Sequence, residues 1–514
     1  MNPNEIIIKE IIKSRVKTAE ILAQLKRKAA KKYRIPCPTN LSLLKTYHEM
    51  VKNKRATPAE NIERLLITRP VRSLSGIVNV SVLTKEYPCP GKCLYCPVES
   101  GIPKSYVSGE PAVERAKKLH YDPYLQVKKR IEMLKEQGHP TDKIELRIVG
   151  GTWSYYPKRY QDWFVKKCFD ACNGKTSKNL EKAQEANEKA EYRIVGLSVE
   201  TRPDFINEKE IKHLRELGAT LVEMGVQSIY DDVLQKNLRG HNVKETISAT
   251  KLLKNAGFKI LYQMMPNLPG ASLKRDEKMF AKLFSNPDFQ PDLLKIYPCA
   301  LLKSAPLYKL WRQGRYKPYS EPQLTTLIKK IKKTIPYYVR IQRISRDIPS
   351  YSIISGPAKI SNLRQMLSAD MEKGKWQCEC IRCREVKDGN LPGEKIRLFR
   401  QDYEASEGKE IFLSFESGNR KLYSLLRLRI IPGEAIIREI HTYGPSVPLA
   451  KRNKSPQHRG LGKKLIKAAE KIAGDEFNSE KISVIAGVGV RNYFRREGYK
   501  LENTYMVKRL RYRS

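Results

Sequence analysis

The middle of the chain alternates short apolar runs with amphipathic segments. Six runs rich in β-branched residues lie between residues 70 and 350, at 77–83, 144–151, 192–200, 220–228, 258–270 and 292–298. Strands that are apolar throughout and are separated by amphipathic helices are typical of a parallel sheet covered on both faces. Because no dinucleotide-binding fingerprint accompanies these units, they favour an α/β fold over 70–350, a partial (β/α)6 barrel of the TIM type.

The pattern changes after residue 395. Strand-like stretches follow one another between residues 396 and 444, and then come a glycine-rich loop, a helix, a strand, a short helix and a last strand. This order predicts antiparallel hairpins in one α+β domain over 396–514. We expect 351–395 to be a linker between the two domains.

The first 69 residues predict a basic helical arm. Ile7, Ile8 and Ile11 recur at helical spacing, and residues 1–55 contain fourteen Lys or Arg against four Glu. One interpretation is a solvated helical face. The other is contact with RNA, which the whole chain favours, because its formal net charge is +43 and its pI is about 9.8. A polyanion is the expected partner of such a chain, since neutralising phosphates releases counterions.

The sequence predicts neither a membrane protein nor a secreted one. No uncharged apolar run reaches the roughly 18 residues of a membrane span, and the apolar stretch near the start is too short for a signal peptide. We therefore expect a cytoplasmic protein. Its ten cysteines include two close clusters, which in such a chain indicate bound metal rather than disulfides.

The first cluster, Cys89, Cys93 and Cys96, follows the first predicted strand. Three thiolates at this spacing can hold three irons of a four-iron cluster and leave the fourth iron open, whereas an electron-transfer cluster uses four cysteines. A zinc knuckle with a distant fourth ligand is the alternative. The motif, with Tyr95 before the last cysteine, resembles the radical S-adenosylmethionine (SAM) superfamily.

That resemblance implies a [4Fe–4S] cluster and SAM, held at the carboxyl ends of the barrel strands, and chemistry by a 5′-deoxyadenosyl radical. It also implies that the backbone of Gly150 and Gly151 accommodates the methionine amino group of SAM. Five polar residues near strand ends are either cofactor contacts or ordinary strand-end groups: Glu200, Arg202, Gln227, Arg239 and His241.

The second cluster, Cys378, Cys380 and Cys383, lies in the linker. Without a preceding strand, a structural zinc site is the favoured interpretation, and it requires a fourth ligand. We expect Cys37 in that role, with His48 as the second candidate, so that the metal would pin the N-terminal arm to the linker. Free or redox-sensing thiols are the alternative.

The last domain contains a glycine-rich loop, Gln457–Gly462, at the start of a helix. Free backbone N–H groups and the helix dipole suit such a turn to phosphate. The form Q-x-x-G-x-G resembles the pyrophosphate loop of the GNAT acetyltransferases, which implies acetyl-CoA as the ligand. The implied contacts are, in the loop, Gln457, Gly460, Leu461, Gly462 and Lys463, and, in the strand beside the pantetheine arm, Glu439, Ile440, His441 and Thr442. Tyr493 and Phe494 would approach the thioester as catalytic residues; core packing is their alternative role.

A radical SAM barrel followed by an acetyltransferase domain resembles the catalytic subunit of Elongator. The resemblance covers residues 70–510, through the motifs at 121–126, 149–160, 200–204, 239–241, 346–349 and 487–499. It implies a tRNA-modifying enzyme that forms 5-carboxymethyluridine at the wobble position, U34, of the anticodon stem-loop. Lys158 matches a family position linked to acetyl-CoA, so we expect it to position the thioester near the radical centre. A homodimer and accessory Elongator-type proteins are compatible partners.

The chemistry agrees with this resemblance. A radical on the acetyl methyl carbon can add to the C5=C6 bond of uridine, after which oxidation, proton loss and thioester hydrolysis leave a carboxymethyl group. We expect the stretch 329–346 to be a loop that grips tRNA, because it interleaves cations for phosphate with tyrosines for stacking. The cations are Lys329, Lys330, Lys332, Lys333 and Arg340; a solvated helix flank is the alternative.

Two other functions remain open at this point. The acetyl-CoA loop alone is compatible with a protein lysine acetyltransferase that uses the barrel only as a scaffold. The charge alone is compatible with an RNA-binding adaptor whose sites are vestigial. Turnover of acetyl-CoA that is stimulated by tRNA would distinguish a tRNA-modifying enzyme from both of these alternatives.

Overall fold

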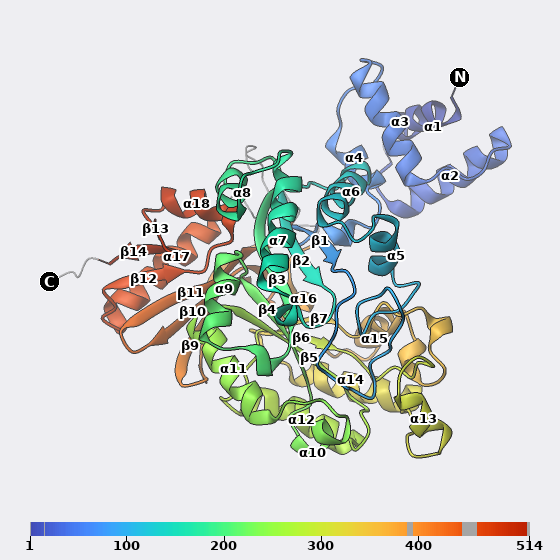
Figure 1. Ribbon diagram of the computed structural model, residues 1–514. Helices are drawn as coiled ribbons and strands as arrows, with labels where there is room; N and C mark the ends of the chain where they lie inside the picture. Colours follow the sequence, from blue (N-terminus) through green and yellow to red (C-terminus); the bar gives the residue numbers. More distant parts are fainter. Residues whose placement is uncertain (1, 15, 388–393, 445–459, 511–514) are drawn as a thin grey trace.

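The computed structural model describes residues 2–14, 16–387, 394–444 and 460–510. It begins with four helices, α1 (Pro3–Lys13), α2 (Ala19–Tyr33), α3 (Asn40–Lys52) and α4 (Glu60–Leu66). The side chains of Asn2, Thr18 and Thr39 cap the first three of them. Ile7, Ile8 and other apolar residues of these helices bury one another in a separate small core. The predicted helical arm is thus present, and α1 to α3 project from the rest of the molecule (Figure 1).

The central sheet has seven parallel strands in the order of the sequence. They are β1 (Val78–Leu83), β2 (Lys143–Val149), β3 (Arg193–Thr201), β4 (Leu221–Gln227), β5 (Lys259–Met264), β6 (Leu293–Ile296) and β7 (Arg340–Arg343). The predicted partial barrel is confirmed with one strand more than expected. The additional strand, β7, lies in the stretch 329–346, which we expected to be a loop. The sequence pattern missed it because Ile341 is buried among charged neighbours that mask the apolar pattern.

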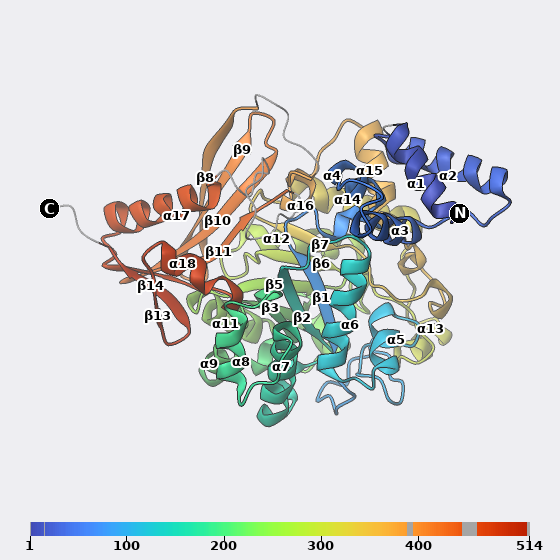
Figure 2. The same cartoon turned by 90° about the horizontal axis from the view of Figure 1, so that it is seen from above.

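Helices cover the outside of this sheet, and α6, α7, α9 and α11 follow one another along the barrel in Figures 1 and 2. The helices after β1 and β2 are α5 (Pro111–Lys118), α6 (Pro123–Glu136), α7 (Lys158–Asn173) and α8 (Leu180–Asn187). Those after the next strands are α9 (Glu208–Glu216), α10 (Asp231–Lys236), α11 (Val243–Asn255), α12 (Leu273–Ser285), α13 (Leu307–Arg312) and α14 (Glu321–Thr334). Their inward side chains, among them Phe164 and Leu253, form one core with the outer faces of the strands.

Two helices, α15 (Leu363–Lys373) and α16 (Ile381–Arg384), lead to a second sheet. Its strands are β8 (Ile396–Ala405), β9 (Gly408–Ser417), β10 (Leu422–Ile431), β11 (Glu434–Thr442), β12 (Lys481–Val484), β13 (Lys500–Glu502) and β14 (Tyr505–Arg509). The order is β13-β14-β12-β11-β10-β9-β8, and only the β11–β12 pair is parallel. Helices α17 (Leu461–Lys471) and α18 (Arg491–Arg496) complete this domain. The predicted mixed α+β domain is confirmed.

The second sheet attaches to the barrel at the amino ends of its strands. Arg438 of β11 donates to Asp292, which precedes β6, at 2.6 Å, and to the carbonyl of Phe258, which precedes β5. Lys259, the first residue of β5, lies 3.3 Å from Glu439. Phe412 and Tyr423 of the second sheet also belong to the same apolar core as the barrel. The C-terminal domain therefore closes the amino end of the barrel.

Among the described residues, no helix combines the length and the apolar character that crossing a membrane requires.

Candidate functional site

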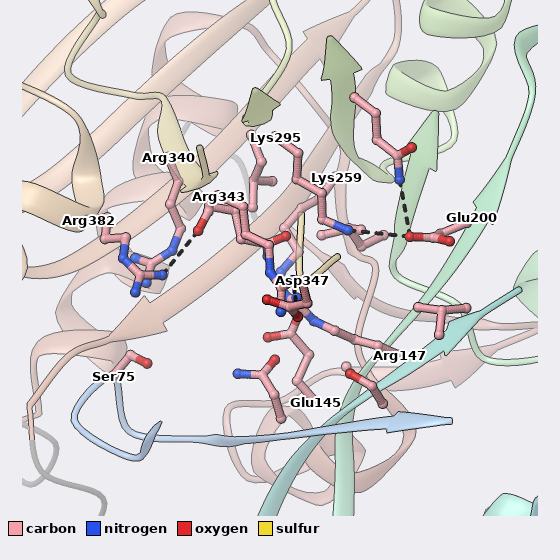
Figure 3. A pocket seen from close by; sticks show the side chains of 18 of the residues that line it. Ser75, Glu145, Arg147, Glu200, Lys259, Lys295, Arg340, Arg343, Asp347 and Arg382 are labelled. Atoms are coloured by element: carbon pink, nitrogen blue, oxygen red, sulfur yellow. Dashed lines mark hydrogen bonds and ion pairs between the residues drawn. The ribbon is translucent and has the colours of Figure 1, made fainter. Parts of the chain in front are cut away.

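One cavity of about 1580 Å³ extends through the barrel from the first cysteine cluster to the C-terminal domain. At the carboxyl ends of the strands it is lined by Cys89, Cys93 and Cys96. At the other end it is lined by Gly460, Gly462 and Tyr493. Figure 3 shows the charged side chains between these ends, which project from several strands toward one another. The interior of this barrel is therefore a polar chamber, unlike the packed apolar layers of a closed TIM barrel.

The first cysteine cluster lies on the loop that follows β1. Cys93 is 3% exposed, and Arg239 donates from Nη1 to its Sγ at 3.5 Å. A hydrogen bond from Cys96 and the charge of Arg239 lower the pKa of the Cys93 thiol, although burial opposes them. A thiolate is the form that binds metal.

The surroundings of this loop fit a bound cluster and cofactor. Within the part of the chain that the structure describes, several buried polar atoms near this loop have no hydrogen-bond partner, among them Arg202 Nη1, Gln227 Oε1 and Arg239 Nε. Buried polar groups normally have partners, so these atoms point to a polar ligand.

Gly150 and Gly151 follow β2 at the same end of the cavity. Their φ angles are +139° and +95°, and a Cβ on Gly150 would overlap Thr84 Oγ1. Only glycine therefore allows this turn to pass so close to the end of β1. Gly151 lines the cavity, as the predicted contact with the methionine group of SAM requires.

Glu200, near the end of β3, is held from three sides. Tyr106 Oη donates to it at 2.7 Å, Gln263 Nε2 at 3.1 Å and Lys295 Nζ at 3.4 Å. The carboxylate is thus fixed at the carboxyl end of the chamber, where a cofactor hydroxyl or amino group can contact it. His241 lies nearby as a neutral imidazole, because burial and then the charges of Arg239 and Arg202 lower its pKa to about 2.

Further inside, charged residues alternate in sign along the barrel wall. Lys295 pairs with Glu223 as well as with Glu200, and Arg147 pairs with Glu145 at 3.3 Å. Burial alone would raise the pKa of Glu223, but Lys295 and Arg147 lower it, so this carboxyl is ionised. The sequence analysis singled out Glu200 but missed Glu145, Arg147, Glu223 and Lys295. A lysine or glutamate inside an otherwise apolar strand, as at 292–298 and 220–228, was the signal that could have found them.

The end of the cavity next to the C-terminal domain contains the predicted acetyl-CoA residues. Gly460 precedes α17 with φ +71°, and nothing lies within 4 Å of the Cβ position there. Around Gly462, a Cβ would lie 3.3 Å from Tyr493 Oη, 3.6 Å from Ile440 and 3.8 Å from Thr442. The structure thus brings together the helix start, the end of β11 and α18. Gln457 lies outside the described residues.

The other residues of this group have different surroundings. Glu439 pairs with Lys259 and, at 2.8 Å, with Arg427, and His441 contacts the carbonyl of Ser75 at 2.7 Å. Both join the domains while lining the cavity. Lys463 lines it too and pairs with Glu497 at 3.2 Å. Phe494 is 2% exposed but reaches the cavity wall. Leu461 belongs to the core and does not line the cavity, because its side chain points toward the barrel core.

The second cysteine cluster is compact. The ligand atoms of Cys378, Cys380 and Cys383 lie within 4.8 Å of one another, close to the roughly 3.8 Å between thiolates around one tetrahedral zinc ion. The predicted fourth ligand is wrong: Cys37 is exposed and is not part of the group among the described residues. It lies between α2 and α3, two of the helices that project from the rest of the molecule (Figure 1). His48, the second candidate, pairs instead with Glu63 at 3.4 Å.

The predicted tRNA-binding cations are divided by the fold. Lys329, Lys330, Lys332 and Lys333 belong to α14, and Arg340 begins β7. Lys329 and Lys330 pair with Asp370 and Glu277 at 2.8 Å, and Lys333 lies over Trp376. Lys332 cannot face solvent, because it is 2% exposed with Nζ 3.5 Å from Cys383 Sγ. Tyr338 is likewise buried and stacks on Tyr403, so it cannot stack on a base.

Lys158 is not where the sequence analysis expected it. It begins α7 on the outside of the barrel, pairs with the buried Glu210 of α9, and is absent from the cavity lining. The tyrosines before it turn toward the loop after β1, and this turn carries the lysine away from the chamber.

Comparison with known proteins gives consistent matches over most of the chain. Residues 88–283 match the radical SAM superfamily, and residues 291–373 match the Radical_SAM C-terminal domain. The tRNA uridine(34) acetyltransferase of Methanocaldococcus infernus is 45% identical, with 98% of each chain covered. The human Elongator complex protein 3 is 38% identical, with 98% of this chain and 96% of the human protein covered.

A solved structure shares the fold. The archaeal Methanocaldococcus infernus Elp3 with an N-terminal deletion superposes with a TM-score of 0.75 at 43% identity. The match covers 85% of this chain and the whole of that structure. The barrel, the linker and the C-terminal sheet are therefore one shared arrangement.

Proposed function

The chain belongs to the family of the tRNA uridine(34) acetyltransferases and Elongator complex protein 3, and on that premise we propose how its chamber performs the reaction. It is a radical SAM enzyme that modifies the wobble uridine of tRNA. The finer proposal is that acetyl-CoA supplies a two-carbon unit and that the product is 5-carboxymethyluridine. The continuous cavity between the cysteine loop and Gly460 carries this proposal, because both ends open to one space.

At the carboxyl ends of the strands, we propose that Cys89, Cys93 and Cys96 hold the [4Fe–4S] cluster. When bound, the cluster and SAM supply a 5′-deoxyadenosyl radical, which can take a hydrogen atom from an acetyl methyl group. Gly151 lines the cavity where the methionine part of SAM would lie, and Gly150 allows the turn to approach Thr84. Glu200 is held in place to orient the cofactor. The hydrogen bond from Cys96 and then the charge of Arg239 lower the pKa of the Cys93 thiol.

At the amino ends of the strands, Gly460 and Gly462 offer backbone N–H groups to the phosphates of acetyl-CoA. Ile440 and Thr442 flank the path of the pantetheine arm, and Tyr493 Oη reaches the same place. Burial raises the pKa of Tyr493 to about 12, so its hydroxyl keeps its proton at neutral pH and can donate to the thioester carbonyl. Between the two ends, charged side chains line the chamber without filling it. The chamber can therefore admit a polar base.

The discriminating experiment supplies tRNA, SAM, a reductant and acetyl-CoA labelled with ¹³C at the methyl carbon, under anaerobic conditions. We expect the label in a C5 substituent of U34, read by mass spectrometry of nucleosides. With deuterated methyl groups, deuterium should appear in 5′-deoxyadenosine. A lysine peptide that is acetylated equally well without tRNA or SAM would instead support the lysine acetyltransferase alternative, and unlabelled tRNA would refute our proposal.

We also propose that Cys378, Cys380 and Cys383 bind a zinc ion that fixes the linker. Their compact spacing supports this. A tetrahedral zinc site needs a fourth ligand, and we propose that it is not a side chain of the described residues.

The N-terminal arm would contribute to binding of the tRNA. Deleting residues 1–55 should weaken tRNA binding at least tenfold and leave acetyl-CoA hydrolysis nearly unchanged; equal tRNA affinity would contradict a role for the arm.

A further inference from the structure

The barrel sheet does not close on itself. Its order runs from β1 to β7 without a pair between these two edge strands, and both line the cavity. Two acceptor atoms on these edges, Asn79 Oδ1 of β1 and Gln342 Oε1 of β7, are buried and have no hydrogen-bond partner within the described chain. Gln342 is 8% exposed. Buried acceptors without partners at an opening indicate a ligand that brings N–H donors.

A group of three arginines borders the β1 side of this opening. Arg72 precedes β1, and Arg115 and Arg130 belong to α5 and α6, which pack against β1. All three line the cavity. Arg72 donates to Gln137 at 2.6 Å, whereas Arg115 and Arg130 make no hydrogen bond or ion pair within residues 2–387 or the other described segments. We call Arg72, Arg115 and Arg130 the first arginine group.

These guanidinium groups are half-buried and repel one another. Burial and then the charges of Arg115 and Arg72 lower the pKa of Arg130 to about 10, and burial and Arg72 lower that of Arg115. No carboxylate of the described chain lies within 4.0 Å of the three. Other half-buried cations of the chamber, such as Lys259 and Arg340, have a carboxylate partner. Asp347 attracts Arg115 from a longer distance, so the cluster is compensated only in part. The remaining repulsion costs folding free energy, which a bound anion would relieve.

A second arginine group, Arg364 and Arg382, borders the β7 side. Arg364 donates to the carbonyl of Ile341 and Arg382 to that of Gln342, each at 3.2 Å, so both are anchored to the open edge of β7. In Figure 3, Arg382 and Arg340 lie on one side of the pocket, and Glu145 and Arg147 lie on the other.

We propose that a single-stranded RNA segment crosses the opening between β1 and β7, with backbone phosphates held by the two arginine groups and the nucleotide between them turned into the chamber. The inference rests on the proposed function and adds the route by which the base enters. Guanidinium groups suit phosphate because they donate in a planar fork. A base that enters sideways reaches the chamber between its two ends, and a uracil N3–H there can donate to Gln342.

Coenzyme A also carries phosphates, and the test must separate the two sources. Arg130→Gln and Arg382→Gln remove one cation from each group. The matched control is Lys128→Gln, which makes the same charge change on the exposed face of α6. Each arginine variant should weaken binding of an anticodon stem-loop about tenfold. It should also reduce the slope of log affinity against log salt by about 0.7 for each lost phosphate. Stem-loop affinity of the Lys128→Gln control should change less than twofold. The KM for acetyl-CoA should also change less than twofold in each arginine variant.

The decisive arm places neutral methylphosphonate linkages on each side of U34. With the unsubstituted protein and with Lys128→Gln these linkages should weaken binding about tenfold, whereas with Arg130→Gln or Arg382→Gln one of the two linkages should cost nothing further. Thermal unfolding should show Arg130→Gln at least as stable as the unsubstituted protein, because mutual repulsion is removed. A lower melting temperature would indicate a structural role instead.

The outcomes separate the inference from the proposed function. Full labelling of U34 together with equal losses for Arg130→Gln and Lys128→Gln overturns the crossing and leaves the function intact. A raised KM for acetyl-CoA with unchanged stem-loop affinity assigns the arginines to coenzyme A and overturns it too. Stem-loop binding that follows our pattern without any modified nucleoside supports the crossing and refutes the function.

Discussion

Gly487 lies so close to β3 that a Cβ on it would overlap the carbonyl group of Val195. Gly489, two residues on, meets the backbone of Ile194 in the same way, with 3.0 Å to its N and O atoms. Gly487 and Gly489 are therefore needed for close contact between the C-terminal domain and the barrel.

Gly487→Ala should destabilise the protein by about 1–3 kcal/mol, because the backbone of β3 must move to admit the methyl group. Chemical denaturation of the full chain measures this. Gly418→Ala is the control, since nothing lies within 4 Å of its Cβ position and its φ is not positive. A change below about 0.5 kcal/mol is expected there. Equal stability of the two variants would show that this contact is absent in solution.

Gly460→Glu should abolish binding of acetyl-CoA and leave tRNA affinity within twofold. A carboxylate would fill the space at the start of α17 and repel the phosphates. Gly460→Ala separates charge from backbone strain, because φ is +71° and alanine there costs about 1 kcal/mol. Calorimetric titration with acetyl-CoA gives the answer. Unchanged affinity in the glutamate variant would contradict the assignment of this loop.

Arg239→Gln should reduce tRNA modification about 10- to 100-fold, because a residue that orients a metal ligand usually affects activity to that extent. The loss of positive charge beside Cys93 should also make the reconstituted cluster harder to reduce. A potentiometric titration followed by electron paramagnetic resonance tests this. Arg239→Lys keeps the charge, so the reduction potential of its cluster should stay close to that of the unsubstituted protein. A potential that is the same in all three proteins would exclude an electrostatic role for Arg239.

Glu439 should contribute to acid unfolding. Lys259 and Arg427 outweigh burial and lower its pKa from 4.5 to about 2. A depressed carboxyl pKa adds stability that is fully present above about pH 4.5 and is lost as pH falls through about 2; here the amount is about 3 kcal/mol. Glu439→Gln should therefore be less stable at pH 7 and show a flatter fall of stability below pH 4.5. Glu434→Gln, exposed at the other end of β11, should follow the unsubstituted protein. Parallel pH curves for all three proteins would argue against the pairing.

Substitutions in the second cysteine cluster and at Cys37 should have different effects. Cys378→Ala should lose a bound zinc ion and lower the melting temperature, whereas Cys37→Ala should change neither, because Cys37 is exposed and apart from the cluster. Elemental analysis of protein purified without chelators measures this. Zinc retained in Cys378→Ala would show that the metal, if present, binds elsewhere.

Local patterns predicted much of the fold. The six apolar runs, the hairpins after 395 and the amphipathic N-terminal helices all correspond to elements of the structure. The strand β7 was missed, because Arg340 and Arg343 flank only two buried residues. A four-residue edge strand next to arginine groups does not show the apolar run by which inner strands are found.

The site was predicted only where a motif is contiguous. The loop of Cys93 and the turn of Gly150 could be placed because each follows a strand directly. Cys37 and Lys158 were misplaced, since both required knowing how distant segments pack. Glu223 and Lys295 stand out as charges within apolar strands, but their grouping becomes apparent only when the seven strands face one another. No pattern along the chain shows which side of a buried strand faces a chamber.

The way in which the C-terminal sheet closes the amino end of the barrel limits how this protein can be divided. Arg438, buried to 1% exposure, has its partner Asp292 on the other domain. A gene split near residue 390 would give two products, each with an exposed charged face and half of a shared core. We expect neither product to accumulate as a stable protein when it is expressed alone, because each would lack the partner of its buried charges.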